Sequence, residues 1–468
     1  MLKGIIQTIE ISGLFGRFEH VVPRDGVLHS PAILYGDNGV GKSTILNMVF
    51  HLLSAAGNEG HRTALRKIPF KKISVSLVNG ARLTAEKGDD FDTDSVLTLQ
   101  VWKEGGVVAE WEQTGRGRNY RYAFDDEILR EIKLRGGDFE NISSDLLMDI
   151  MTRRPSTRHH DQVKRGEKGY LDALRTFAPA MFYLNADRKL DSDSVADPSE
   201  ELELRQALNH RELKHATDVL QASRAISLKQ ALSNASRWVN SRAVRSANLG
   251  SENVHSVYEK VIGQLAIDYQ PKDSALFRAE IDELISDLNK IEGDTRDFAE
   301  YELTSKLSME KFRWSLNTGD PSRDSMSARL IGPYVKSLTS RLDAIRPIYE
   351  VLDDFVTTIN GFLTRKTLTY ELSHGFVILD DRNDKLEASQ LSSGEQQLLL
   401  IFSYVLAARD TPSVFIIDEP EISLNVKWQR KMVESLMRVS EGSEIQFILA
   451  SHSIELITQH MDSVVEIY

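Results

Sequence analysis

Glycines, a lysine and a serine between residues 36 and 43 have the types and spacing of a phosphate-binding loop (P-loop). The segment GDNGVGKS follows an apolar stretch at residues 32–35 and opens an apolar run with helical spacing. In such a loop backbone N–H groups turn toward phosphates, the lysine reaches the β and γ phosphates, and the serine ligates Mg²⁺. A plain glycine turn is the alternative, but strand, loop and helix occur in the required order. The residues expected to bind the nucleotide are Gly36, Asn38, Gly39, Gly41, Lys42, Ser43 and Thr44.

Two adjacent carboxylates follow four apolar residues near the end of the chain. Asp418 and Glu419 come directly after residues 414–417 and are followed by Pro420. At the end of a buried strand, the aspartate can hold the Mg²⁺ shell and the glutamate can polarise the attacking water. Two adjacent acids are often a solvated turn, but this chain also carries a P-loop. We therefore expect Asp418 to join Ser43 as a metal ligand and Glu419 to be catalytic.

A second anion site is predicted 26 residues before Asp418, where Ser-Ser-Gly-Glu-Gln-Gln opens an apolar helix. Serine hydroxyls, a glycine backbone and a helix N-terminus attract phosphate without a lysine. One chain does not need two phosphate sites, whereas a head-to-tail dimer does. A simple helix cap at Ser392 or Ser393 is the alternative. The residues expected to contact nucleotide are Ser392, Ser393, Gly394 and Glu395.

A histidine follows the last apolar strand pattern of the chain. His452 lies 33 residues after Glu419 and directly after the segment FILAS. Sheets of the α/β class bind ligands at the carboxyl ends of their parallel strands. An imidazole there can contact the γ-phosphate and respond to its loss. A lone histidine is usually a surface or packing residue, but this position favours a catalytic role.

Together these segments resemble the ATP-binding-cassette (ABC) ATPases. The likeness rests on residues 36–44, 391–397, 414–420 and His452. The segment DEPEISLNVKWQ, after a long helical stretch, is similar to the structural-maintenance-of-chromosomes (SMC) and overcoming-lysogenization-defect (OLD) branch. The size resembles the ATPase subunits of bacterial anti-phage systems such as Septu and PARIS. The resemblance implies ATP-driven dimerisation, with residues 423–425 near the interface. It also requires a glutamine loop, for which Gln100 is a weak candidate.

The elements that must position these residues are strands of two kinds and a block of helices. Alternating patterns at residues 5–11, 71–88 and 95–114 predict hairpins of an antiparallel sheet. The continuous apolar runs in VFIIDEP and IQFILASHS are typical of parallel strands buried on both faces. Residues 191–363 have helical spacing without a sustained heptad pattern, which predicts a compact insertion or a short arm.

The predicted fold class is therefore α/β: a P-loop ABC-type ATPase head, in which a mixed parallel core sheet stands beside an antiparallel sheet, with a helical insertion. Residues 1–190 and 364–468 would form the two parts of the head, and residues 191–363 the insertion or arm.

Composition excludes several classes of function. A net charge of −12 argues against a protein that coats nucleic acid. The absence of cysteine excludes disulfides, thiolate catalysis and cysteine-ligated zinc. No apolar run reaches the roughly 20 residues of a membrane span, and the N-terminus lacks the pattern of a signal peptide. We therefore expect a cytoplasmic protein without membrane contact.

The expected function is ATP hydrolysis in a homodimer or higher homo-oligomer. Head closure would gate a separate effector protein, a nuclease or toxin, or contact with DNA, in bacterial anti-phage defence. The alternatives are an SMC-like DNA-repair ATPase and a slow-turnover, ATP-bound sensor scaffold. No nuclease domain is expected in the chain. Basic residues at 152–169 could bind nucleic acid or be a solvated loop, and residues 60–70 form another predicted basic loop.

Overall fold

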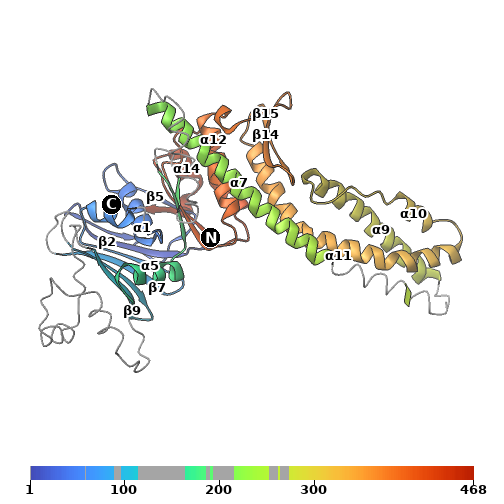
Figure 1. Ribbon diagram of the computed structural model, residues 1–468, viewed down its shortest axis with the longest axis horizontal. Helices are drawn as coiled ribbons and strands as arrows, with labels where there is room; N and C mark the ends of the chain where they lie inside the picture. Colours follow the sequence, from blue (N-terminus) through green and yellow to red (C-terminus); the bar gives the residue numbers. More distant parts are fainter. Residues whose placement is uncertain are drawn as a thin grey trace, which may run out of the picture. The chain divides into compact units, whose positions relative to one another are not determined.

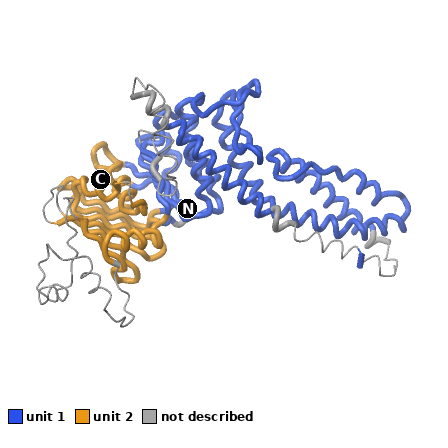
Figure 2. Tube along the Cα trace, in the orientation of Figure 1, with its two compact units in different colours: residues 1–5, 29–35, 180–465 blue, residues 6–28, 36–179, 466–468 orange. Residues whose placement is uncertain are grey.

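The structure is a computed structural model, and it describes residues 2–57, 60–88, 96–113, 164–185, 190–192, 216–251, 262–263 and 274–468. By its internal contacts the chain divides into two compact units (Figure 2). Unit 1 contains residues 1–5, 29–35 and 180–465, and unit 2 contains residues 6–28, 36–179 and 466–468. Each unit is described by itself.

The core of unit 1 is a six-stranded sheet in which four neighbouring strands run parallel. Its strand order is β12-β11-β16-β17-β5-β18. The bounds are β5 Ala32–Tyr35, β11 Ala180–Leu184, β12 Leu190–Ser192, β16 Ser413–Asp418, β17 Ile445–Ala450 and β18 Val464–Glu466. Every residue of β16 and β17 is buried. Strands with both faces covered need continuous apolar sequence, so the prediction of buried parallel strands is confirmed.

Three helices of unit 1 carry or follow the predicted site segments: α12 (Ser393–Ala407), α13 (Val426–Val439) and α14 (Ile454–Gln459). The residues of α12 after its first turn are almost all buried, in one hydrophobic cluster with β11, β16 and β17. The rings of Phe182 on β11 and Phe415 on β16 stack with centroids 4.3 Å apart within this cluster. The apolar core therefore holds the start of α12 and the ends of the strands in fixed positions.

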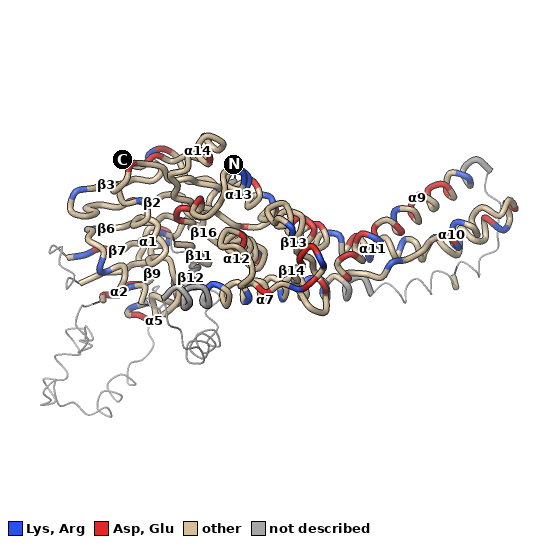
Figure 3. The backbone as a smooth tube through the Cα atoms, turned by 90° about the horizontal axis from the view of Figure 1, so that it is seen from above, with Lys and Arg blue, Asp and Glu red and all other residues tan. Residues whose placement is uncertain are grey.

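The helical insertion of unit 1 consists of α7 (Ala216–Ser251), α9 (Ser274–Phe298), the turn η1 (Ala299–Tyr301), α10 (Glu310–Ser315) and α11 (Pro321–Asn360). Helix α11 packs against α7 along one part of its length and against α9 along another (Figure 1). Charged residues are frequent along α9, α10 and α11 (Figure 3). Ion pairs link α9 to its neighbours, as between Asp294 and Arg346 at 2.5 Å. The charged helical spacing of the sequence predicted helices in this part of the chain, and they are present.

A small sheet follows the long helix. Its strands β13 (Lys366–Glu371), β14 (Gly375–Asp380) and β15 (Lys385–Leu386) are antiparallel, as predicted for the first two. The turn η2 (Ala388–Gln390) then leads into α12, while η3 (Met461–Ser463) precedes β18. A short pair, β1 (Leu2–Lys3) and β4 (His29–Ser30), completes unit 1.

The described residues of unit 2 form a largely antiparallel sheet of seven strands, in the order β10-β9-β8-β7-β6-β2-β3, and three helices. The strands are β2 Ile6–Leu14, β3 Phe18–Val22, β6 Lys72–Leu77, β7 Ala81–Lys87, β8 Leu97–Lys103, β9 Gly106–Gln113 and β10 Lys164–Arg165. The helices are α1 Lys42–Leu53, α2 His61–Lys67 and α5 Gly166–Phe177. The predicted hairpins are confirmed, because β2–β3, β6–β7 and β8–β9 all pair antiparallel. The α/β fold of a P-loop ATPase is thus present in the two sheets.

Candidate nucleotide-binding site

The P-loop lies in unit 2, between the end of β5 and the start of α1. Gly39 and Gly41 have φ angles of 89° and 95°, a left-handed region that favours glycine. Gly41 is the N-cap of α1, and no side chain caps this helix end. The first N–H groups of α1 are therefore not engaged by a capping side chain and can face an anion.

Lys42 is buried and turned back over the loop that precedes it. Its Nζ donates hydrogen bonds to the carbonyl oxygens of Gly36 at 2.8 Å and Asp37 at 3.0 Å. Ser43 is exposed on the first turn of α1, and its carbonyl accepts a hydrogen bond from the Asn47 amide. The ammonium thus lies within the curve of the loop, where it can serve a phosphate bound to the same backbone.

Gly36 begins the loop at a point where the backbone is tightly packed. A Cβ atom at this position would lie 2.2 Å from the carbonyl oxygen of Ile467. We expect Gly36→Ala to displace the loop, to lower the free energy of unfolding by about 1–3 kcal/mol and to weaken ATP binding at least about tenfold. Thermal unfolding and ATP titration measure the two effects. The matched control is Gly88→Ala, since a Cβ there meets nothing within 4 Å; equal behaviour of the two variants would contradict the packing.

The turn between β2 and β3 lies beside the P-loop and was not singled out from the sequence. A Cβ at Gly41 would lie 3.0 Å from Leu14 and 3.7 Å from the ring of Phe15. Phe15 is partly exposed and has a φ of 53°, which is uncommon for an aromatic residue. The Arg17 guanidinium lies 5.2 Å from the ring of Phe18 in the same turn. The apolar ring of Phe15 therefore lies close to the start of α1.

His20, on β3, also contacts the P-loop. Burial lowers the pKa of His20 from its usual value, although a hydrogen bond to the Val40 backbone opposes this shift. The imidazole is therefore neutral at physiological pH and acts as a hydrogen-bonding support for the loop.

In unit 1 the two acids occupy the carboxyl end of β16. Asp418 is 5% exposed, and the Tyr183 hydroxyl lies 3.5 Å from its Oδ2. Glu419 has a φ of 49°, and its N–H donates to the carbonyl of Ala450 at 2.9 Å. A left-handed conformation at a non-glycine residue costs energy and is frequent at functional sites. The backbone thus directs these neighbouring side chains differently, one inward and one outside the strand.

The structure brings His452 to the same edge of the sheet. Parallel pairing places Asp418 beside Ala450, so Glu419 and His452 follow the ends of neighbouring strands. The His452 side chain is exposed, while its backbone N–H donates to Glu421 Oε1 at 2.8 Å. The two acids and His452 therefore follow the carboxyl ends of neighbouring parallel strands, where the strand pattern located them.

The serine-rich segment forms a capped helix start. Ser392 is the N-cap of α12 and forms a capping box with Glu395, so Ser392 and not Ser393 is the cap. The Glu395 carboxylate also pairs with Lys366 Nζ at 2.7 Å. Burial alone would raise the pKa of Glu395, but the hydrogen bonds from Lys366 and Ser392 outweigh it and lower the pKa. The anionic carboxylate is thus committed to the protein, while the hydroxyl of Ser393 is exposed.

Gly394 connects this helix start to the loop that follows the acids. A Cβ at Gly394 would lie 2.7 Å from the carbonyl oxygen of Ser423 and 3.1 Å from the ring of Trp428. Ser423 is exposed and has a φ of 68°. Residues 392–394 and 423–425 therefore form one surface at the end of unit 1.

Other predicted positions are not part of this surface. Gln100 lies in β8, where its amide donates to Glu110 Oε1 at 3.0 Å. Residues 60–70, predicted as a basic loop, instead include the helix α2, in which Arg62 donates to the carbonyl of His51 at the end of α1 at 2.7 Å. This arginine therefore helps to fix the C-terminal end of α1. The basic residues 153, 154 and 158 and the histidines 159 and 160 lie outside the described residues.

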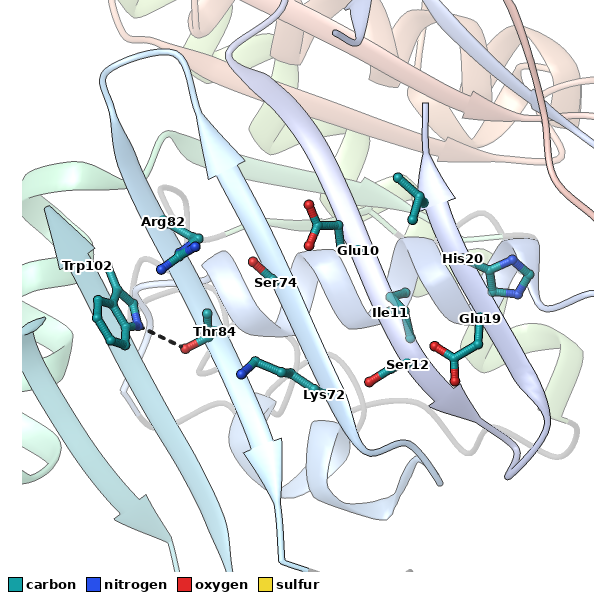
Figure 4. A pocket seen from close by; sticks show the side chains of 11 residues that line it. Glu10, Ile11, Ser12, Glu19, His20, Lys72, Ser74, Arg82, Thr84 and Trp102 are labelled. Carbon is teal, nitrogen blue, oxygen red and sulfur yellow. Dashed lines mark hydrogen bonds between the residues drawn. The ribbon is translucent and has the colours of Figure 1, made fainter. Parts of the chain in front are cut away.

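A hollow of about 410 Å³ lies on the polar face of the seven-stranded sheet (Figure 4). Trp102 contacts two of the other side chains that line it. The Trp102 Nε1 donates to Thr84 Oγ1 at 3.3 Å, and the Arg82 guanidinium lies 5.1 Å from the Trp102 ring. The hollow is lined by side chains of the sheet strands β2, β3, β6, β7 and β8, and the P-loop does not contribute to it.

The chemistry of the donor atoms within each unit fits a nucleotide with Mg²⁺. In unit 2 the P-loop supplies backbone N–H groups and an ammonium for phosphates, and Ser43 carries a hydroxyl, while in unit 1 Asp418 carries a carboxylate; both are oxygen ligands of the kind that Mg²⁺ prefers. Within the described parts of the chain no three histidine or acidic side chains cluster as a separate metal site. In those same parts, no helix combines the length and apolar character needed to cross a bilayer.

Comparison with known proteins identifies a family for this chain. The profile of the family described as "AAA domain, putative AbiEii toxin, Type IV TA system" matches residues 187–458, which is more than half of the chain. A curated relative, the probable D,D-dipeptide transport ATP-binding protein DdpF of Escherichia coli, is 27% identical over 134 residues. That alignment covers 29% of this chain and 42% of the relative, so the chain spans less than half of its length.

Two solved structures that are similar to this chain are SMC head domains of Pyrococcus. The head of Pyrococcus furiosus, bound to the C-terminal domain of ScpA, is 13% identical, with a TM-score of 0.34 and coverage of 97% of this chain and 91% of that one. The head of Pyrococcus yayanosii, with a coiled coil and joint, is 15% identical, with a TM-score of 0.32 and coverage of 97% and 93%.

Proposed function

This chain belongs to the family described as "AAA domain, putative AbiEii toxin, Type IV TA system", and on that premise we propose that it is an ABC-type head that binds and hydrolyses ATP. Two heads would close around ATP as a homodimer, or within a higher homo-oligomer, and hydrolysis would reopen them. The products of the reaction are ADP and phosphate.

One observation carries this proposal: the chain has two helix N-termini suited to phosphate, and the side chains at one differ from those at the other. The start of α1 has the glycine loop and Lys42, whereas the start of α12 has exposed Ser393, and the lysine that lies beside it, Lys366, is paired with Glu395. An incomplete anion site is useful when another chain supplies the remainder of the ligand shell. The α12 start of one chain would cover the γ-phosphate held by the P-loop of another.

Exposed apolar side chains beside the proposed closing surface support contact with a second copy. Val426 directly follows residues 423–425, and Ile454, which is 78% exposed, lies two residues after His452. Apolar side chains that flank exposed polar loops are typical of surfaces that another protein covers.

The proposed chemical roles follow from the side chains. Ser43 and Asp418 would hold Mg²⁺, which neutralises charge on the β and γ phosphates when bound. Glu419 would accept a proton from, and orient, the water that attacks the γ-phosphorus, and His452 would donate a hydrogen bond to a γ-phosphate oxygen. Lys42 would stabilise the charge of the β and γ oxygens.

A sizing experiment tests this function. We expect the mass from light scattering to double, or to rise to a higher multiple, when Mg²⁺ and a non-hydrolysable ATP analogue are added. Lys42→Ala should lose phosphate binding, since the ammonium is removed, and its mass should not respond. ATP bound by the wild-type chain without any change in mass would contradict head closure; unchanged ATP affinity in Lys42→Ala would contradict the P-loop assignment.

We further propose that closure controls a separate effector, a nuclease or toxin, in anti-phage defence. Support comes from the insertion, which presents Trp314 on α10 with 74% of its surface exposed. Contact with nucleic acid is the alternative outcome. Purification with the products of neighbouring genes, with and without nuclease treatment, distinguishes a protein partner from DNA or RNA. Steady turnover would favour this cycle, whereas tight ATP binding with very slow turnover would favour a sensor scaffold.

A further inference from the structure

Glu421, two residues after the proposed catalytic Glu419, holds the loop that carries His452. Its Oε2 accepts a hydrogen bond from Ser451 Oγ at 2.9 Å, and its Oε1 accepts one from the His452 backbone N–H at 2.8 Å. Both oxygens of one carboxylate are thus bonded to consecutive residues of the loop after β17. Such two-point attachment restrains both the distance and the orientation of the loop.

The bonding pattern requires an acceptor at this position. Ser451 is fully buried, and its Oγ accepts from the Ser453 N–H at 3.0 Å, so its own proton is directed to Glu421. The His452 N–H is also a donor. A carboxylate, which has only acceptor sites when ionised, satisfies both donors at once.

The same network continues to the loop that follows the acids. Ser453 Oγ donates to Gln429 Oε1 at 2.8 Å, and Gln429 Nε2 donates to the carbonyl of Leu424 at 2.9 Å. Leu424 in turn donates its N–H to the carbonyl of Glu421 at 3.0 Å. Residues 451–453 and 421–424 are therefore joined in a closed ring of hydrogen bonds.

We propose that Glu421 is a positioning residue, which sets His452 against the γ-phosphate and couples that histidine to the surface at residues 423–425. The inference rests on the proposed ATPase function. When the γ-phosphate leaves, a shift of His452 would move its own N–H, then Glu421, and through the ring the surface that meets the second subunit. The residue itself would touch neither ATP nor the reacting water.

Glu421→Ala tests the role by separating binding from turnover. We expect the ATP dissociation constant to stay within about threefold of wild type, because the P-loop is unchanged, and kcat to fall about 10- to 100-fold. Glu421→Gln should have a kcat between those of Glu421→Ala and the wild type, since its amide oxygen can still accept from the His452 N–H while the proton of Ser451 Oγ loses its acceptor. If Glu421→Ala does not fold, Glu421→Asp takes its place, because the shortened side chain cannot reach both donors.

The matched control is Glu455→Ala. Glu455 is the second residue of α14, three residues after His452, and its carboxylate pairs with Arg430 of α13 at 2.8 Å. It is thus an acid close to the same loop in sequence, but its ion pair joins α14 to α13. Exposed pairs of this kind contribute about 0–1 kcal/mol, so kcat should stay within about twofold of wild type.

A double-mutant cycle distinguishes positioning from general support. In a His452→Ala background, Glu421→Ala should lower kcat by less than about twofold, because the group that it positions is gone. The inference would be overturned if the fold losses in kcat of the two single variants multiplied in the double variant. It would also be overturned by a kcat within twofold of wild type for Glu421→Ala alone. The proposed function fails separately: it fails if the wild-type chain has no ATP turnover, or if Lys42→Ala turns over ATP like the wild type.

Discussion

Glu419→Gln is expected to leave ATP bound and to slow hydrolysis about a hundredfold or more, because the amide cannot take a proton from the attacking water. The substitution preserves the shape of the side chain. The backbone of residue 419, with a φ of 49°, is held by the hydrogen bond from its N–H to the carbonyl of Ala450, which does not depend on the side chain. Single-turnover hydrolysis and an ATP titration on the same preparation measure the two effects.

The control for this variant is Glu441→Gln, which changes the same chemical group on the exposed turn after α13. Its turnover should equal that of the wild type. Wild-type turnover in Glu419→Gln would instead move the catalytic role to another residue. Loss of ATP binding in Glu419→Gln would show that the carboxylate serves nucleotide affinity and not the chemical step.

Ser393→Arg is expected to retain ATP binding while hydrolysis and ATP-dependent closure are lost. Ser393 is exposed at the start of α12, and the adjacent Gly394 packs on the loop of Ser423, so an arginine at residue 393 can extend into solvent. It would obstruct a second subunit that closes on this surface. ATP titration and light scattering with the non-hydrolysable analogue measure the two properties. Loss of ATP binding by this variant alone would place the serine in its own chain's pocket.

Mixing variants then shows whether α12 acts across subunits. A heterodimer of one Ser393→Arg chain and one Lys42→Ala chain would retain one intact composite site, with the other doubly defective. We expect partial activity on mixing two inactive proteins, up to about half of the wild-type activity per dimer if the sites are independent. No recovery, in heterodimers verified by native mass spectrometry, would contradict independent composite sites. Ser389→Arg, on η2 just before α12, is a control for a surface arginine.

Local patterns allowed the main elements to be predicted. The hairpins could be read because strands alternate with period two and the turns Asn79-Gly80 and Gly105-Gly106 are short-range signals. The buried strands β16 and β17 could be read because both faces are covered, which leaves continuous apolar runs. The P-loop, the serine-rich helix start, the acids and the histidine could also be recognised in their order along the chain, because each motif consists of residues close together in sequence.

Interactions between distant segments could not be predicted in this way. The partners of Glu421 lie 30 and 31 residues further along the chain, and nothing in the segment DEPEIS specifies them. The basic residues near position 62 suggested a basic loop, whereas Arg62 is buried in α2 against the end of α1. The position of Phe15 beside Gly41 depends on how β2 and β3 cross the sheet. The local sequence shows a turn there through the glycines 13 and 16, which both have positive φ, but it does not show what Phe15 contacts.

The pairing of β5 with β17 has a consequence for how the protein is made. Ile33 lies opposite Leu449, so the strand that leads into the P-loop joins its sheet through a partner 416 residues later in the chain. A ribosome adds about 5–20 residues each second and exposes the N-terminal part first. The strand must therefore wait, without this neighbour, until β17 has emerged from the ribosome. A nascent chain would complete this part of the sheet only after residues 445–450 have been made, so that products truncated before β17 would not enter the proposed ATP cycle.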